Sequence, residues 1–358
     1  MGKLGLPDIK IEFQTAGITA IKNSEKGTVA LILRDTVKSP NTFKITNVTQ
    51  IPEGLTVANK AYIERAFLGY INAPKCILIY VIGAEDTIDE ALTYFATQKF
   101  DYICLPPTAT SEEATKLKTW IVSERTNNNA IYKAVVPNLA ADSEAIINVT
   151  AEGMTDGKNS YTAAEYCSRV AGLIAGTPMK ISCSYAPLPE LTDITRLSKT
   201  DGDAAVDAGK FIFVHDGTKV KVGRGVNSFV TTVEGKGDAY KKIKIVEAID
   251  MINQDIRTTC EDSYIGKWSN SYDNKCVLIT AIKGYFEELE LKGILGKGTS
   301  KIGIDIAAQT NYLNKQGIDT STMSEQEIKE ANTGSFVFLT ATLSILDAIE
   351  DIQIQIAI

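Results

Sequence analysis

The stretch that decides the fold is CILIYVIGAEDTIDEALTYFATQKFDYICLPP, residues 76–107. Its first part, CILIYVIG, is a continuous apolar run, which is typical of a strand buried on both faces. Thr87-Ile-Asp-Glu90 matches a capping box and predicts a helix that ends near Gln98. DYICL is the next predicted strand, and Pro106-Pro107 stops it. Strand, helix and strand in this order predict two parallel strands joined by a right-handed crossover.

The alternation of helix and strand continues toward the C-terminus. SEEATKLKTWIVSER predicts a helix, and IYKAVV and AIINVT predict the strands that follow it. Thr162-Ala-Ala-Glu165 is a second capping box and predicts a helix that ends near Ala175. In FIFVHDGTKVKV, Asp216-Gly217 is a favoured two-residue type I′ turn, so we expect a β-hairpin. These elements together predict a central α/β domain at residues 75–240.

The regions on either side of this domain have different patterns of apolar and polar residues. TVALILR and TFKITNV predict strands, so residues 23–74 are expected to form a small β-rich unit. Beyond residue 240, apolar stripes predict helices over about 240–259 and 275–292, followed by the loop-rich stretch GILGKGTSKIG. A short helix capped by Ser324 with Glu327 and a strand in SFVFLTATLSI complete an expected α+β domain at residues 241–345. The predicted fold class is therefore mixed, α/β at the centre and α+β toward the C-terminus.

Both ends of the chain alternate apolar and polar residues and predict exposed strands, which we call arms. The C-terminal arm, residues 346–358, carries Ile352, Ile354, Ile356 and Ile358 on one face. The N-terminal arm, residues 1–22, carries Ile9, Ile11 and Phe13 in the same way. A strand of this kind needs a sheet edge to pair with, because it presents unpaired backbone groups.

Free-energy estimates leave open whose sheet the C-terminal arm joins. Burial of its four isoleucines stabilises by roughly 6 to 12 kcal/mol, at about 1.5 to 3 each. Ordering about eight backbone residues costs roughly 8 to 16 kcal/mol. Since these sums nearly cancel, the arm is ordered only on a preformed sheet, where ladder hydrogen bonds and covering side chains tip the balance. That sheet belongs either to the same chain or to a neighbouring subunit.

The composition excludes several classes of protein. The 358 residues are 44% hydrophobic and 23% charged, as in ordinary soluble globular proteins. A net charge of -7, without a Lys/Arg run and interleaved aromatics, argues against nucleic-acid binding. The start lacks a secretory pattern and the longest apolar run is too short to cross a bilayer, so we expect a cytoplasmic protein without membrane insertion. The six cysteines stand singly and are expected to be buried thiols.

A search for a reactive site gives no catalytic, metal or cofactor candidate. GILGKGTS departs from a phosphate loop, since Gly298 follows Lys297 where the motif requires Ser or Thr. The single histidine, His215, directly precedes a turn, where a general base would be poorly held. Carboxylate pairs such as Asp347 with Glu350 are common on solvated helix faces, and the sequence does not distinguish them from an acid/base couple.

Four stretches resemble the contractile-tail sheath proteins of bacteriophages and of phage-tail-like particles, especially their short forms. They follow the family's order and are YTAAEYCSRVAGLIAGTPMK, DAGKFIFVHDGTKVKVGRGVNSFVT, MINQDIRTTCEDSYIGKWSNSYDNKCVLITAIKGYFEELELKGIL and TGSFVFLTATLSILDAIEDIQIQIAI. At the place of the family's common Trp-Gly-Ala-Arg-Thr-like stretch, this chain has VGRGVNSFVTT. The large outer insertions of many relatives are absent.

The resemblance implies a structural subunit and not an enzyme. Sheath subunits form stacked hexameric rings, equivalent to a helical polymer, around a tail tube, and contraction drives the tube through a target cell envelope. The implied partners are other copies of the chain, the tail tube protein, and baseplate and tail-terminator proteins. The implied location is a virion tail or phage-tail-like particle assembled in the bacterial host cytoplasm. The resemblance also implies that both arms add strands to sheets of neighbouring subunits.

Glu287, Glu288 and Glu290 form an acidic helix face and are a hypothesis for the tube contact, although a solvated face explains them equally well. The alternative function is a soluble α/β enzyme or ligand-binding protein whose terminal strands complete its own sheet. It predicts a pocket at the strand C-termini, near Gly83, Pro106 and Pro137. A non-contractile polymer built by strand exchange is a third reading.

Overall fold

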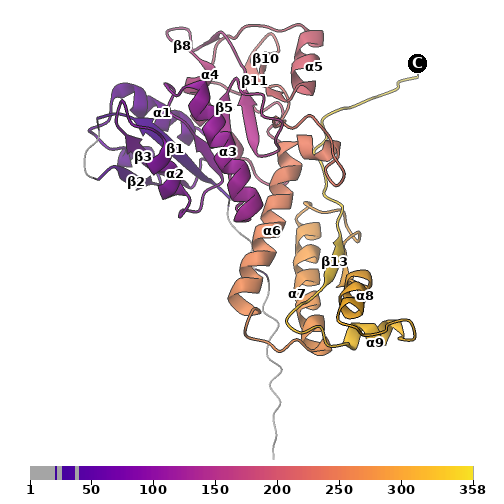
Figure 1. The fold of residues 1–358 in the computed structure, drawn as a ribbon. Coiled ribbons are helices and arrows are strands. Elements are labelled where there is room, and N and C mark those ends of the chain that lie inside the picture. The colour runs from indigo at the N-terminus through magenta and orange to yellow at the C-terminus, as the bar shows by residue number, and fades with distance from the viewer. Residues whose placement is uncertain (1–20, 22–25, 37–39, 358) are drawn as a thin grey trace, which may run out of the picture. The chain divides into compact units, whose positions relative to one another are not determined.

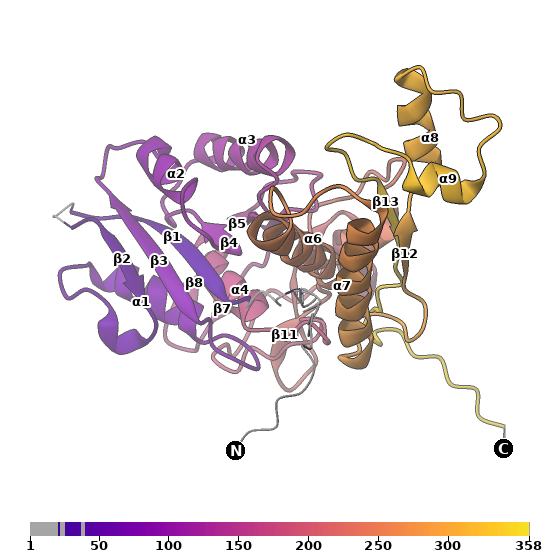
Figure 2. The same cartoon turned by 90° about the horizontal axis from the view of Figure 1, so that it is seen from below.

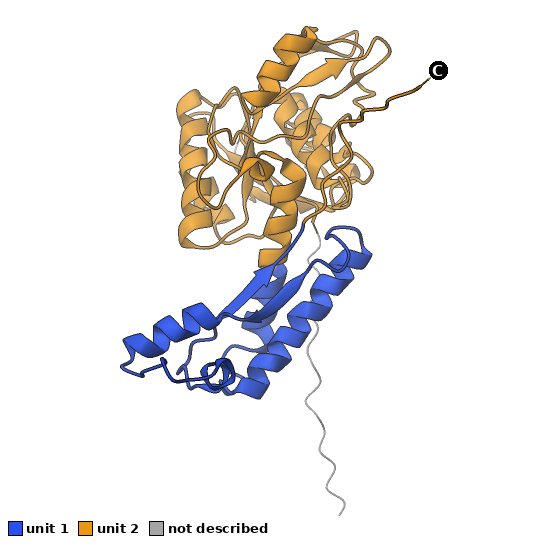
Figure 3. Cartoon of the chain, turned by 90° about the vertical axis from the view of Figure 1, so that its right-hand side faces the viewer, with its two compact units in different colours: residues 1–22, 255–344 blue, residues 23–254, 345–358 orange. Residues whose placement is uncertain are grey.

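The computed structural model describes residue 21, residues 26–36 and residues 40–357, and it divides into two compact units (Figure 3). The larger unit consists of residues 23–254 with 345–358, and the smaller unit of residues 1–22 with 255–344. No helix in the described part of the chain is long and apolar enough to cross a membrane.

The larger unit is built on a seven-stranded sheet with the order β2-β3-β1-β4-β5-β6-β9 (Figure 1). Neighbouring strands are parallel except for the antiparallel pair β2 and β3. The strands are β1 (Thr28–Arg34), β2 (Thr42–Ile45), β3 (Cys76–Ile82), β4 (Tyr102–Cys104), β5 (Lys133–Pro137), β6 (Ile146–Val149) and β9 (Lys210–Phe211). The predicted parallel sheet is therefore confirmed.

Helices cover both faces of this sheet (Figure 2). One face packs against α1 (Val57–Phe67) and α4 (Ala163–Ala175), and the other against α2 (Asp89–Phe95) and α3 (Ser111–Asn127). Alternate residues of β1 serve the two cores: Leu31 points toward α1 and α4, whereas Ala30 and Ile32 point toward α2 and α3. Burial on both faces is the reason that the central strands are continuously apolar.

The predicted domain boundaries differ from the observed ones. Residues 23–74 do not form a separate β-rich unit, because β1 lies inside the sheet between β3 and β4 and residues 57–67 are helical. The boundary expected at residue 240 lies instead between Gln254 and Asp255, within α6 (Ile243–Ser263). Local patterns identify a strand or a helix, but a parallel strand pairs with partners distant in the chain, which those patterns do not encode.

In the larger unit, one of the two predicted capping boxes forms and the other does not. Thr162 and Glu165 form the reciprocal capping box at the start of α4. At α2, the helix begins one residue later than expected: Ile88 is the N-cap residue, and the Thr87 hydroxyl donates to the carboxylate of Asp89 instead. The acidic first turn of α2 stabilises its positive N-terminal end without a side-chain cap.

The predicted hairpin forms, but its turn is shifted by one residue. Strands β10 (Phe213–His215) and β11 (Val220–Val222) pair antiparallel, and the N–H of Asp216 donates to the carbonyl of Lys219. Gly217 and Thr218 are therefore the two turn residues, rather than Asp216 and Gly217. The Asp216 carboxylate accepts the N–H groups of Thr218 and Lys219, which favours this position. The larger unit also contains β7 (Met154–Thr155), β8 (Ser160–Tyr161) and α5 (Lys199–Asp207).

The smaller unit consists of helices and one two-stranded sheet. Its elements beyond the end of α6 are α7 (Tyr272–Leu291), β12 (Lys301–Ile304), α8 (Ile306–Lys315), α9 (Glu325–Glu330) and β13 (Leu339–Thr342). The predicted α7 is confirmed, as is the Ser324–Glu327 box that caps α9. The sequence does not predict β12 or α8, because the glycines before β12 suggest a loop and α8, capped by Asp305, is a short helix.

A glycine at the contact of α1 and α4 gives a test of this packing. A Cβ atom at Gly172 would lie 1.8 Å from the carbonyl oxygen of Ala66. We expect Gly172→Ala to lower the free energy of unfolding by about 1 to 3 kcal/mol, because the helices must move apart. The matched control is Gly202→Ala in α5, where the nearest atom would lie at 3.9 Å. It should stabilise by about 0.5 to 1 kcal/mol. Urea denaturation measures both, and equal signs would contradict the packing.

Candidate assembly site

The C-terminal segment has two parts with different surroundings. Residues 345–351, which we call the arm root, belong to the larger unit. Residues 352–357, which we call the free arm, follow without strand pairing in the described structure and run away from the larger unit as an extended trace (Figure 1). In the free arm, Ile352, Ile354 and Ile356 are 72%, 77% and 79% exposed. Isoleucine at this exposure indicates a surface that another element covers.

Glu350 fixes the arm root to the larger unit. Its side chain is only 7% exposed. One carboxylate oxygen accepts hydrogen bonds from the hydroxyls of Ser182 and Ser184. The other lies 3.2 Å from Lys242 Nζ and 3.4 Å from Arg224 Nε. Two cations and two hydroxyls thus compensate one buried carboxylate, as burial of a charge requires.

Three further contacts hold the residues around Glu350. Arg224 pairs with Asp351 at 2.6 Å, Lys242 pairs with Asp347, and Lys244 Nζ donates to the carbonyl of Leu346. The hydrogen bond from Arg224 lowers the pKa of Asp351 below its usual value, and the same bond raises the pKa of Arg224. Both groups therefore stay ionised near neutral pH. Five residues of the larger unit make these contacts with the arm root, and we call them the arm clamp: Ser182, Ser184, Arg224, Lys242 and Lys244.

Local structure brings the segments of the clamp together. Gly225 N–H donates to the Ser184 hydroxyl, and a Cβ atom at Gly225 would lie 2.9 Å from the sulfur of Cys183. Only glycine allows this close approach. A β-bridge between Val226 and Lys242 then places the start of α6 beside Arg224 and Gly225. Arg224 and Lys242 consequently face the same carboxylate although they are distant in sequence.

A two-stranded sheet in the smaller unit has the form of an acceptor for strands. In β12 and β13, Ile302 pairs with Ala341 and Ile304 with Leu339, so these four residues share one face. The other face carries Lys301, Gly303, Thr340 and Thr342. Among the described residues no further strand joins this sheet, and its two outer edges therefore lack a backbone ladder. β12 packs against α7, which supports the sheet, and the open edges leave room for further strands.

The predicted site residues have different positions in the structure. Ile9, Ile11, Phe13 and Ile358 lie outside the described residues. Glu287 and Glu288 lie on α7, where they pair with Lys283 at 3.8 Å and Lys292 at 2.6 Å.

Glu290 differs from its two neighbours on α7. Its carboxylate accepts the N–H groups of Gly298 and Ser300, and the side chain of Ser300 together with these N–H groups holds its pKa below the usual value. Glu290 is thus engaged with the loop before β12.

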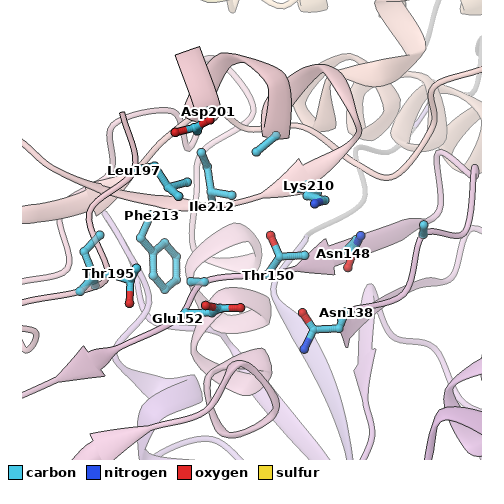
Figure 4. Close-up of a pocket in the computed structure, with 14 residues that line it drawn as sticks. Asn138, Asn148, Thr150, Glu152, Thr195, Leu197, Asp201, Lys210, Ile212 and Phe213 are labelled. Carbon is cyan, nitrogen blue, oxygen red and sulfur yellow. The ribbon is translucent and has the colours of Figure 1, made fainter. Parts of the chain in front are cut away.

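A cavity of about 480 Å³ lies where β5, β6 and β9 end (Figure 4). Asn138, next to Pro137, lines it, whereas Gly83 and Pro106 do not. Its ionisable lining groups are Glu152, Asp201 and Lys210, and it contains neither histidine nor cysteine. No group of three or more potential metal ligands occurs among the described residues. The cavity therefore offers hydrogen-bonding groups but no histidine-activated nucleophile.

The sequence does not predict the arm clamp. In sequence, Asp347 and Glu350 are an ordinary carboxylate pair, and VGRGVNSFVTT is a departure from a family pattern. The spacing of three acidic residues directly before an alternating strand is the one local signal that could have suggested an anchored root. The partners Ser182, Arg224 and Lys242 carry no local signal, because they meet Glu350 only in the folded chain.

Comparisons with known proteins give one consistent result. Models of the phage tail sheath protein central domain and C-terminal domain match residues 81–228 and 235–358. The tail sheath protein of Clostridium phage phiCD119 is 38% identical over 98% of this chain and 99% of its own length.

Two solved structures have the same fold. A sheath tail protein of Desulfitobacterium hafniense aligns with a TM-score of 0.70 at 16% identity, over 83% of this chain and 94% of its own. A chain of the anti-feeding prophage helical sheath in the contracted state aligns with a TM-score of 0.69 at 12% identity, over 99% of each chain.

Loss of the central carboxylate tests the arm clamp. In Glu350→Ala, we expect the amides of residues 345–351 to exchange hydrogen about tenfold faster, because the root loses its buried contacts. Hydrogen–deuterium exchange with mass spectrometry at pH 7 measures this. The control is Asp193→Ala, which removes the exposed pair with Arg196 and should leave the root unchanged. Unchanged exchange in Glu350→Ala would show that the clamp does not hold the root.

Proposed function

This chain belongs to the phage tail sheath protein family, and from that premise we propose that neighbouring subunits are joined by exchange of its terminal arms. The protein is a structural subunit of a contractile tail sheath, and not an enzyme. It is a component of a phage tail or a phage-tail-like particle. The alternative of an enzyme or ligand-binding protein is therefore dropped.

The main support for the proposal is the exposed isoleucine face of the free arm, which directly follows an arm root held by the arm clamp. Ile352, Ile354 and Ile356 alternate with polar residues and are all mostly exposed. A second subunit that provides a sheet edge would bury this face and supply backbone hydrogen bonds. Ile358, one residue beyond the described structure, continues the same alternation.

The sheet of β12 and β13 is the acceptor that we propose. Its apolar face carries Ile302, Ile304 and Leu339, and its other face carries mainly polar residues. A donor strand with isoleucines on one face and glutamines on the other matches this division in one orientation of its faces only. The isoleucines of the incoming arm would extend the apolar face, while Gln353 and Gln355 would extend the polar face. The sheet has two free edges in the described chain, one for each arm.

We extend the same role to the N-terminal arm. Ile9, Ile11 and Phe13 repeat the alternation of the C-terminal arm and would add to the opposite edge of the acceptor sheet. With both arms engaged, each subunit is tied to two neighbours by backbone ladders. Such ladders keep subunits attached while their bodies rotate and slide, which contraction requires.

The remaining partners follow from the sheath role. The proposed polymer consists of hexameric rings stacked in a helical sheath around a tail tube, with baseplate and tail-terminator proteins at its ends. Assembly takes place in the bacterial host cytoplasm. Contraction is downhill from a metastable extended state, so the subunit needs no nucleotide.

The tube contact that we propose is the acidic surface of α7, Glu287 and Glu288 with Glu290 at its edge. Exposed charge pairs are weak and are screened by salt, which suits a contact that must break on contraction. Glu287 and Glu288 are paired with lysines of their own helix, and exposed pairs of this kind exchange partners at little cost. Glu290 contributes less, since two backbone N–H groups occupy its carboxylate.

Substitution of the isoleucine face tests strand exchange. We expect Ile352→Ser with Ile354→Ser and Ile356→Ser to abolish sheath polymers, because the donor strand loses its apolar face. Negative-stain electron microscopy measures assembly, and the melting temperature of the dilute chain should stay unchanged. The control carries Gln353→Ser and Gln355→Ser, which alter the polar face of the same arm and should allow polymers. Polymers of normal length in the isoleucine variant would refute strand exchange through this arm.

Charge reversal tests the tube contact. Glu287→Lys with Glu288→Lys should weaken binding of the sheath to purified tail tubes, measured by co-sedimentation, about 5- to 30-fold, since each of the two unfavourable charge contacts costs about 0.5 to 1 kcal/mol. The control is Glu325→Lys with Glu330→Lys on α9, which makes the same change in charge. Equal binding by both variants and the unaltered chain would remove α7 from the tube contact.

A further inference from the structure

We propose that the surface around the arm root is a second contact between copies of this chain. It packs against the smaller unit of the copy whose β12–β13 sheet receives the free arm. The residues that make the contact are Tyr185, Leu346 and Ile349, which we call the exit surface. The inference rests on the proposed function, because strand exchange is what brings the second copy to this place. It adds a contact between folded units to the link through the arm.

Strand exchange does not explain the exposure of Ile349. Its side chain is 88% exposed, which is more than any described isoleucine of the free arm. It precedes the free arm, and it does not belong to the alternate set of isoleucines that begins at Ile352. A sheet that covers the set would therefore leave Ile349 in water. Together with two other large exposed side chains nearby, it indicates an interaction surface.

The arm clamp fixes the backbone that carries two residues of the exit surface. Asp347 and Glu350, which lie on either side of Ile349, both pair with a lysine of the clamp. Another lysine of the clamp donates to the carbonyl of Leu346, whose side chain is exposed. A residue whose backbone is already fixed loses less conformational entropy when a partner covers it. Leu346 and Ile349 are thus preorganised for a contact.

Tyr185 is the third residue of the exit surface, and its backbone is strained. It directly follows Ser184 of the clamp, is 61% exposed, and has a left-handed backbone with a φ of 56°. This conformation is unfavourable for a bulky residue. The Tyr185 N–H donates to the carbonyl of Val222 at 3.1 Å, and Lys221 Nζ lies 4.4 Å from the ring centroid. A strained tyrosine with a mostly exposed ring adds little to the core of its own unit and suits an interface.

The place of Ile352 identifies the partner. Asp351 is held by Arg224 at 2.6 Å, and Ile352 is the next residue and the first of the proposed donor face. Since consecutive Cα atoms are about 3.8 Å apart and paired strands about 4.8 Å apart, pairing of Ile352 brings the edge strand of the receiving copy within about 9 Å of the Asp351 Cα. At this distance, side chains next to the acceptor sheet of that copy reach the exit surface.

The smaller unit carries apolar residues where such a contact would form. Phe336 and Val337 are exposed and lie just before Leu339, the first residue of β13. Phe336 is stacked on Phe338, with ring centroids 6.2 Å apart. Aromatic and aliphatic side chains beside the acceptor sheet match the tyrosine, leucine and isoleucine of the exit surface. A second copy of this chain therefore has the chemistry that the exit surface requires.

Photo-cross-linking from position 349 tests the inference. A full chain with p-benzoylphenylalanine in place of Ile349 is mixed into polymers as a small fraction beside the unaltered chain, so that assembly proceeds, and is then irradiated. We expect covalent dimers in which the cross-linked peptide of the second copy lies within residues 255–344. The control has the same group in place of Ile71, an exposed isoleucine of the larger unit, and should give no such dimers. Cross-links to the larger unit or to tube protein, or no dimers, would overturn the inference.

Substitution of the exit surface gives a second, independent measurement. Ile349→Ser and Tyr185→Asn should each raise the chain concentration at which polymers form at least about tenfold, because each removes an apolar contact between copies. Neither should lower the melting temperature of the dilute chain, since Ile349 is exposed and asparagine accepts a left-handed backbone. The matched control, Ile71→Ser, should leave both quantities unchanged. Polymers at the usual concentration in either exit-surface variant would overturn the inference.

The outcomes distinguish this inference from the proposed function. If a chain truncated after Asp351, which keeps the exit surface, still forms polymers, the free arm is not the donor strand and the proposed function fails. If truncation abolishes polymers while Ile349→Ser forms them at the usual concentration, strand exchange stands and the exit surface alone fails. Loss of polymers on truncation, together with dimers cross-linked through the smaller unit, supports both.

Discussion

Backbone N–H and C=O groups of an extended strand need hydrogen-bond partners, and the free arm of this chain has none within the described structure. Its isoleucines need an apolar surface to cover them, because they are exposed to water. The proposed strand exchange would supply this sheet edge, and it would also give a partner to the β12–β13 sheet, which no further strand joins among the described residues. In that proposal, assembly and completion of the fold are one process.

The larger unit is stiffened by buried charges as well as by its apolar cores. Asp250 on α6 accepts hydrogen bonds from Arg125 at 2.8 and 3.1 Å and from Lys133 at 2.8 Å. Burial alone would raise the pKa of Asp250, but the two cations outweigh it and lower the pKa. Glu247, one turn earlier, accepts the Tyr102 hydroxyl at 2.5 Å. These contacts hold the first half of α6 against the sheet, as a subunit that moves as a rigid body requires.

In the proposed assembly, the link between subunits and the contact with the tube rest on different chemistry. Backbone ladders are strong and tolerate any side chain on the solvent face, so they suit a permanent link between subunits. The ion pairs of α7 are exposed and weak, so they suit a contact that is broken during contraction. The arm clamp is intermediate in strength between a backbone ladder and an exposed ion pair. The carboxylate of Glu350 is buried, while that of Asp351 is largely exposed. The arm clamp fixes where the arm leaves the body without restricting what the arm binds.

Local sequence determined the elements whose physics is local. The apolar run at Cys76–Ile82 had to be a strand buried on both faces, the Thr162 box had to open a helix, and the alternation after Asp351 had to place its isoleucines on one face. The tertiary structure alone decided the place of β1 inside the sheet and the convergence of Arg224 and Lys242 on Glu350. Both depend on contacts between residues far apart in the chain, and periodicity, caps and turns report only on neighbours in sequence.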